Sequence, residues 1–160
     1  MDGLAKEAGV TSGAFYKHFD SKADAFREAV VEGMLRLREG VLHFQKQHGN
    51  QWWQQFVSFY LHERRMCELS ASCVLPSLTE EVVRSGASSR LAFETELREI
   101  AVVIATGPKS PDKPDDDKSA FASLATLLGG VTLARAVNDP ELAKSIASSV
   151  EHALLPHRHK

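Results

Sequence analysis

The sequence has no excess of positive charge, few cysteines and no apolar run long enough to cross a membrane. Its 160 residues hold 19 Lys and Arg against 21 Asp and Glu, a formal net charge of −2. Such a chain has no global positive field to gather polyanions, so any nucleic-acid site must be local. Two cysteines, Cys67 and Cys73, do not make a disulfide framework. The longest apolar run, residues 100–105, is far shorter than the roughly 20 residues of a membrane span.

The sequence also lacks an export signal and the short motifs of common enzymes. The start, Met-Asp-Gly-Leu-Ala-Lys-Glu, has neither a basic n-region nor an apolar h-region, so we expect a cytoplasmic protein. Nucleophile-elbow, zinc-protease and glycine-rich phosphate-loop motifs do not occur, and we therefore expect no enzyme and no cofactor. His157 and His159 have no carboxylate or cysteine at ligand spacing, so we expect a solvated tail rather than a metal site.

Period-2 strand patterns are almost absent, whereas apolar residues recur with a helical period along the whole chain. The sequence therefore predicts an all-α fold. The segment 106–117 has three prolines and no large apolar residue, which predicts a mobile loop. The expected helices lie at about residues 2–8, 13–19, 22–47, 52–66, 77–84, 89–105, 118–137 and 141–155.

The first two expected helices are short and meet at Gly9, which makes a helix-turn-helix candidate. The second begins with the small residues 11–14, a slim end suited to a major groove about 12 Å wide. Thr11 leaves backbone N–H groups of this end free to face phosphate. Nearby side chains supply a hydroxyl, two ammonium groups and an imidazole, a local phosphate-binding patch made of Tyr16, Lys17, His18 and Lys22.

Residues 4–22 resemble the helix-turn-helix of the tetracycline-repressor (TetR) family of bacterial regulators. The matching elements are the Ala-x-x-Ala-Gly-Val turn, the Gly-x-x-Tyr-x-x-Phe recognition helix and the Ser-Lys that opens the following helix. Weaker similarity to one regulator subfamily continues at residues 72–75, 92–97 and 133–142. The resemblance implies base contacts by Ser12, Ala14 and Lys17, and phosphate contacts by Thr11, Tyr16, His18 and Lys22.

The resemblance implies two domains: a DNA-binding domain at residues 1–40, and a larger helical domain at 41–160 for effector binding and dimerisation. Met1 stands where the family's second helix begins, so we expect the family's first helix to be missing and the chain to bind its operator more weakly than a version extended upstream. The expected function is a ligand-responsive regulator, most simply a repressor that a small molecule releases from a palindromic double-stranded operator. The alternative is a truncated helical dimer that binds a small molecule but no longer binds DNA specifically.

Aromatic residues crowd the helix that begins at Trp52, more of them than one core-facing stripe would hold. An ordinary core and an effector pocket explain this cluster equally well, and the resemblance favours the pocket. The side chains expected to line it are Trp52, Phe56, Phe59, Tyr60, Leu78, Phe93 and Leu97.

The last two expected helices carry apolar residues on more than one face, which predicts a homodimer formed as a four-helix bundle around a two-fold axis. Their small residues at positions 125, 129, 134, 143 and 147 indicate helices that approach one another closely.

Overall fold

The computed structural model describes residues 17–63, 66 and 74–156, and every regular element in those ranges is helical. The prediction of an all-α fold is therefore confirmed. The expected helices at 2–8 and 13–19 lie outside the described residues, apart from Lys17 and His18, which are helical. The elements are α3 (Lys22–His48), a 3₁₀ turn η1 (Gly49–Gln51), α4 (Trp52–His62), α5 (Val74–Arg84), α6 (Ala87–Thr106), α7 (Asp117–Ala136) and α8 (Pro140–Leu154).

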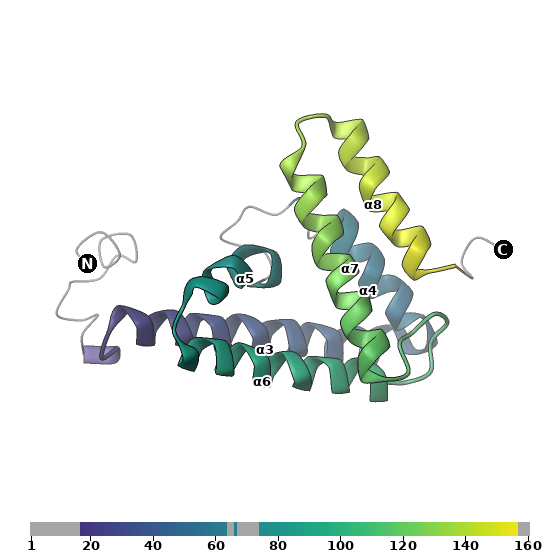
Figure 1. The fold of residues 1–160 in the computed structure, drawn as a ribbon. Coiled ribbons are helices and arrows are strands. Elements are labelled where there is room, and N and C mark those ends of the chain that lie inside the picture. The colour runs from purple at the N-terminus through teal and green to yellow at the C-terminus, as the bar shows by residue number, and fades with distance from the viewer. Residues whose placement is uncertain (1–16, 64–65, 67–73, 157–160) are drawn as a thin grey trace.

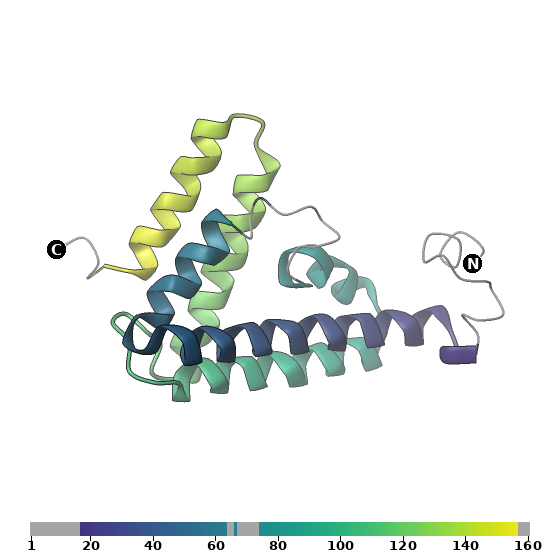
Figure 2. The same ribbon diagram turned by 180° about the vertical axis from the view of Figure 1, so that it is seen from behind.

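Two long helices form the base of the molecule, and the remaining helices pack on one side of it. Figures 1 and 2 show α3 and α6 side by side along the long axis. The α7–α8 hairpin rises from one end of this pair together with α4, and it contacts α4 and α6. Between that group and the N-terminal end of α3 lies α5, which packs on α3. The N-terminal end of α3 is therefore far from the α7–α8 hairpin.

Side-chain caps set the starts of the long helices. The Ser21 hydroxyl accepts a hydrogen bond from the Asp24 N–H at 3.0 Å, which begins α3 where the sequence predicted. Asp116 accepts from the Ser119 N–H at 2.7 Å and opens α7. The predicted cap at Asp139, with Pro140 in the first turn of α8, is also present. Each start lies within two residues of the prediction, because a cap is a local feature of the sequence.

One continuous core joins all six helices. Trp52, Trp53, Ile100, Ile104 and Leu127 are among its fully buried side chains. Beside this core, Arg38 of α3 approaches Glu96 of α6 at 3.4 Å, an ion pair in the seam between the two long helices.

The segment between α6 and α7 is anchored, and the prediction that it is a mobile loop was wrong. Trp52 Nε1 donates to the Pro108 carbonyl at 2.9 Å, and the backbone N–H of Trp53 donates to Ser110 Oγ at 3.3 Å. Lys113 Nζ donates to the carbonyls of Ala105 and Pro114, each at 2.6 Å. These bonds tie the loop to the start of α4 and to the end of α6.

Small residues let α7 and α8 approach closely, as predicted, but at a neighbouring position. A Cβ atom added to Gly130 would lie 2.8 Å from Val150 Cγ2, whereas one added to Gly129 would meet nothing within 4 Å. Ala134, Ala143 and Ala147 are buried in this contact. Ala125 is exposed, so Ala125 and Gly129 belong to the outer face of the hairpin.

Among the described helices, α7 has the length and apolar composition that a membrane crossing would need. In this structure 33% of that apolar stretch is buried, and α7 packs against α4, α5, α6 and α8. The core helices of soluble proteins have the same composition, so this single helix is weak support for a membrane span.

Candidate functional site

Two lysines and a histidine lie near the start of α3, together with the exposed carboxylate of Asp20, and we call this region the basic end. The side chains of Lys17, His18 and Lys22 are all exposed there. The carboxylate of Asp24 accepts from Arg27 Nη2 at 2.6 Å, so its negative charge is paired within α3. Thus three of the predicted DNA-contacting residues share one accessible end of the molecule, where an incoming phosphate would meet their positive charge. The other four, Thr11, Ser12, Ala14 and Tyr16, lie outside the described residues.

An ion pair on α5 is the acidic group that senses this end most directly. Glu81 and Arg84 pair at 2.5 Å on the exposed face of α5. Hydrogen bonding and charge attraction from Arg84 hold the pKa of the Glu81 carboxyl below its usual value, and the charge of Lys22 makes the smallest contribution to the same shift.

The second predicted site, the aromatic cluster, is a packed core in this structure. Phe56 is its centre: its ring lies 5.8 Å from Trp53 and Tyr60 and 5.7 Å from Phe44. Phe44 also contacts Phe59 at 5.3 Å. The rings come from α3 and α4, which join at the short η1 turn.

Six of the seven residues predicted to line a pocket belong to this core or border it. Trp52, Phe56 and Tyr60 are buried, with exposed fractions of 4% or less. Leu78, Phe93 and Leu97 are half-buried and pack against the same core, and Phe59 reaches it through Phe44. The predicted residues therefore come from three helices, α4, α5 and α6, that share one core, and the ring contacts are those among the aromatic residues of α3 and α4.

Trp53 is the residue that the prediction left out of the pocket. It is fully buried, and its indole Nε1 has no hydrogen-bond acceptor among the described residues. Its neighbour Trp52, which the prediction included, donates its own Nε1–H to the Pro108 carbonyl. The sequence shows two adjacent tryptophans and gives no sign of which indole finds a partner, because that partner lies more than 50 positions away.

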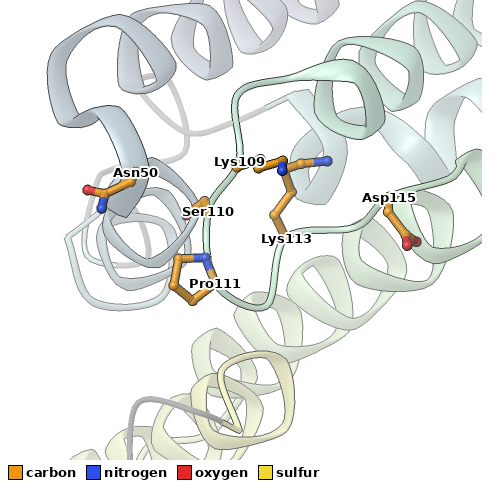
Figure 3. A pocket seen from close by; sticks show the side chains of 6 residues that line it. All are labelled: Asn50, Lys109, Ser110, Pro111, Lys113 and Asp115. Atoms are coloured by element: carbon orange, nitrogen blue, oxygen red, sulfur yellow. The ribbon is translucent and has the colours of Figure 1, made fainter.

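A shallow hollow of about 380 Å³ lies elsewhere, beside the loop before α7 (Figure 3). None of the residues predicted to bind an effector lines it. Its lining side chains come mostly from that loop: Asn50, Lys109, Ser110, Pro111, Lys113 and Asp115. The hollow is wide open to solvent, and the ammonium of Lys113 is already bonded to two carbonyls.

Comparison with known proteins connects the N-terminal segment to DNA binding. Residues 1–29 match the family described as bacterial regulatory proteins, tetR family. The match ends within α3, so it includes the basic end described above and all seven residues predicted to contact DNA. A search of curated proteins found no match to this chain. The matched family consists of regulators rather than enzymes, and its N-terminal domain is a helix-turn-helix. Residues 1–29 are therefore similar to the N-terminal DNA-binding domain of the tetR family of bacterial regulators.

Proposed function

We propose that this protein is a cytoplasmic, homodimeric repressor that leaves its operator when a small molecule binds near the aromatic core. The family match at residues 1–29 is the observation that carries this proposal, because it covers the segment that would enter the DNA groove. For the other two requirements of such a regulator, the proposal assigns the aromatic core to the effector and the outer face of α7 to a second copy.

Lys17, His18 and Lys22 support the DNA part of the proposal. They are exposed at the same end of α3, and that end follows directly from the segment predicted to be the recognition helix. Lysine groups in such a position neutralise phosphates and release counterions, which makes binding depend strongly on salt. Lys17 belongs to the predicted recognition helix, and its proposed role is to contact base edges together with Ser12 and Ala14.

The aromatic core supports the effector part. The predicted pocket residues of α4, α5 and α6 all pack on one continuous core, and α5 also packs on α3, which leads to the segment predicted to bind DNA. The rings are in contact, so an effector that enters this core must displace helices. Displacement of α5 or α3 would move the basic end and lower the affinity for the operator.

The outer face of α7 supports the dimer. Leu133 is 60% exposed there, and Leu142 of α8 is 47% exposed. Ala125 and Gly129 lie on the same side of α7, at four-residue spacing from Leu133. In contrast, three leucine and valine residues that the sequence assigned to the dimer interface are buried within the chain itself: Leu124, Leu127 and Val131.

The test of the DNA proposal is selection of binding sites from a library of random duplexes, followed by titration of the most enriched duplex with the protein. We expect a palindromic site. Lys22→Ala should weaken binding to all sequences and reduce the salt slope by about one, because it removes a phosphate contact. Lys17→Ala should relax the choice of base, since a base contact carries about 1–3 kcal/mol of discrimination.

Lys118→Ala is the matched control, because Lys118 is an exposed lysine at the opposite end of the fold, in the first turn of α7. It should leave both the affinity and the salt slope unchanged. Failure to enrich any sequence would contradict specific DNA binding, and it would leave the alternative of a helical dimer that binds only a small molecule.

A further inference from the structure

Trp53 carries a buried hydrogen-bond donor that the fold does not satisfy. The side chain is 0% exposed, and its Nε1–H finds no acceptor among the described residues. The great majority of buried polar groups in folded proteins have a partner, because an unsatisfied one loses its bond to water and gains nothing in return. The donor is therefore available to an acceptor that comes from outside the described fold.

The surroundings of Trp53 define which kind of molecule could bring that acceptor. Its ring stacks on Phe56 at 5.8 Å with an interplanar angle of 28°, and it meets Trp52 edge to face at 5.5 Å. Flat aromatic walls favour a planar apolar partner. An ion would lose its hydration in such a core, at a cost that one neutral donor does not offset.

Trp52 offers an internal comparison for this argument. Both indoles are fully buried and adjacent in the chain, but Trp52 Nε1 donates to the Pro108 carbonyl at 2.9 Å. That bond holds the loop before α7, which gives Trp52 a structural role. The two tryptophans therefore differ in one respect that matters for ligand binding, the free donor of Trp53.

We propose that the effector is a small uncharged aromatic molecule with one hydrogen-bond acceptor, such as a carbonyl oxygen, and that Trp53 Nε1–H donates to that acceptor. This inference rests on the effector-binding role proposed above and gives that role a ligand class and a recognition residue. The aromatic part of the ligand packs against Phe56, and the new hydrogen bond satisfies the orphan donor. Binding therefore spreads the ring cluster, which connects α3 with α4.

Acetophenone and ethylbenzene are suitable probes, because both have one benzene ring and a two-carbon substituent but only acetophenone has an acceptor. The experiment titrates the full chain with each probe and follows binding by ligand-observed NMR. We expect acetophenone to bind about fivefold more tightly than ethylbenzene. Trp53→Phe should abolish this preference, because it removes the donor and keeps an aromatic ring at the position.

A second measurement needs no variant and remains valid if Trp53→Phe does not fold. The chain has two tryptophans, so an ¹H–¹⁵N spectrum shows two indole signals. The signal that is not protected by a hydrogen bond belongs to Trp53. Acetophenone should move this signal, whereas ethylbenzene should leave its hydrogen-bond state unchanged.

The outcomes separate the inference from the function on which it rests. If both probes bind equally to the wild type and the Trp53 signal does not respond to the acceptor, the aromatic site exists but the role of Trp53 is wrong. If neither probe binds at millimolar concentration, both the inference and the proposed aromatic effector site are overturned.

Discussion

Two helix-interior glycines meet very different surroundings, and this difference allows a matched test. A Cβ atom at Gly130 would press against Val150, whose branched side chain has little rotational freedom to give way. Gly40 in α3 has nothing within 4 Å of such an atom. Gly130→Ala should therefore destabilise the fold by about 1–3 kcal/mol through overpacking. Gly40→Ala should stabilise it by about 1 kcal/mol, because alanine is the better helix former.

Urea unfolding of the two variants beside the wild type measures both changes. The measurement is decisive because the substitutions are chemically identical and differ only in their neighbours. If the two variants shift the urea midpoint in the same direction, the close approach of α7 to α8 at Gly130 is wrong.

Asp116 should make the stability of α7 depend on pH in the acidic range. Hydrogen bonds from the Ser119 side chain and backbone hold the pKa of the Asp116 carboxyl below its usual value. A carboxyl with a lowered folded pKa adds stability above its unfolded pKa of about 3.9, and it loses this contribution as the pH falls through the folded value. Asp116→Ala should therefore lower Tm near neutral pH and have less effect below about pH 3.

Thermal unfolding followed by circular dichroism at both pH values checks this. Asp115→Ala is the control, since Asp115 is exposed in the adjacent loop and does not cap α7. Its effect on Tm should be small and nearly the same at the two pH values. An equal loss of Tm for both variants would show that the cap contributes nothing particular.

The sequence predicted features that depend on neighbouring residues and missed features that depend on distant ones. The starts of α3 and α8 were predicted to within one residue, because their caps, Ser21 and Asp139, depend only on the next two or three positions. Position 129 was among the predicted close contacts of α7, whereas the structure has the close contact at Gly130. Neighbouring residues of a helix point about 100° apart around its axis. Because α7 is apolar on several sides, its sequence does not show which of its faces meets α8.

At the scale of whole elements, α3 connects the two proposed sites. It runs unbroken from Lys22 to His48, so the expected domain boundary at residues 40 and 41 falls inside one helix. Its first turns hold the basic end, and its last turns contribute Phe44 to the aromatic core. A rigid helix that extends from one site to the other is a physical route by which they can influence each other.

The charge of Glu81 on α5 leads to a prediction about DNA affinity. Lys22 contributes slightly to the lowered pKa of Glu81, so we expect the Glu81 carboxylate to offset part of the positive field that a phosphate would meet at Lys22. Glu81→Gln should raise affinity for duplex DNA by about twofold at low salt, and the gain should vanish at high salt, where exposed charges are screened. Fluorescence anisotropy with a labelled duplex at two salt concentrations measures this.

Glu94→Gln is the matched control for the loss of one negative charge. Glu94 pairs with Arg98 at 2.8 Å within α6, just as Glu81 pairs with Arg84 within α5. If Glu94→Gln raises the affinity as much as Glu81→Gln, the effect comes from net charge alone, and the specific effect of Glu81 at Lys22 is refuted.

The loop before α7 shows why element-level prediction failed at one point. Its prolines and charges predicted mobility, which is sound for a segment without partners. Its partners, however, are the indole of Trp52 and the end of α6, and the chain reaches them only after it has folded. The predicted helices succeeded because each is specified by its own periodicity, whereas this loop is specified by tertiary contacts.

At the scale of the whole molecule, the basic end and the hairpin lie at opposite ends of the long axis (Figure 2). A two-fold axis through the hairpin would place two copies of the basic end far apart, as recognition of two operator half-sites requires. In such a dimer, the aromatic core of each copy would lie between the proposed dimer surface and the basic end.

Leu133 offers the sharpest test of this dimer, because an equally exposed leucine lies outside the proposed interface. Leu133 of α7 is 60% exposed and Leu91 of α6 is 64% exposed, so a charge at either position should cost the monomer little. Leu133→Glu should dissociate the dimer, since two copies of the new carboxylate would be buried near the two-fold axis. Leu91→Glu should leave the dimer intact.

Light scattering at micromolar concentration gives the masses of the wild type and the two variants. The Tm of the wild type should also rise with protein concentration, because association stabilises the folded state. A monomeric wild type would refute the dimer. Dimers of equal stability in both variants would show that the interface lies elsewhere.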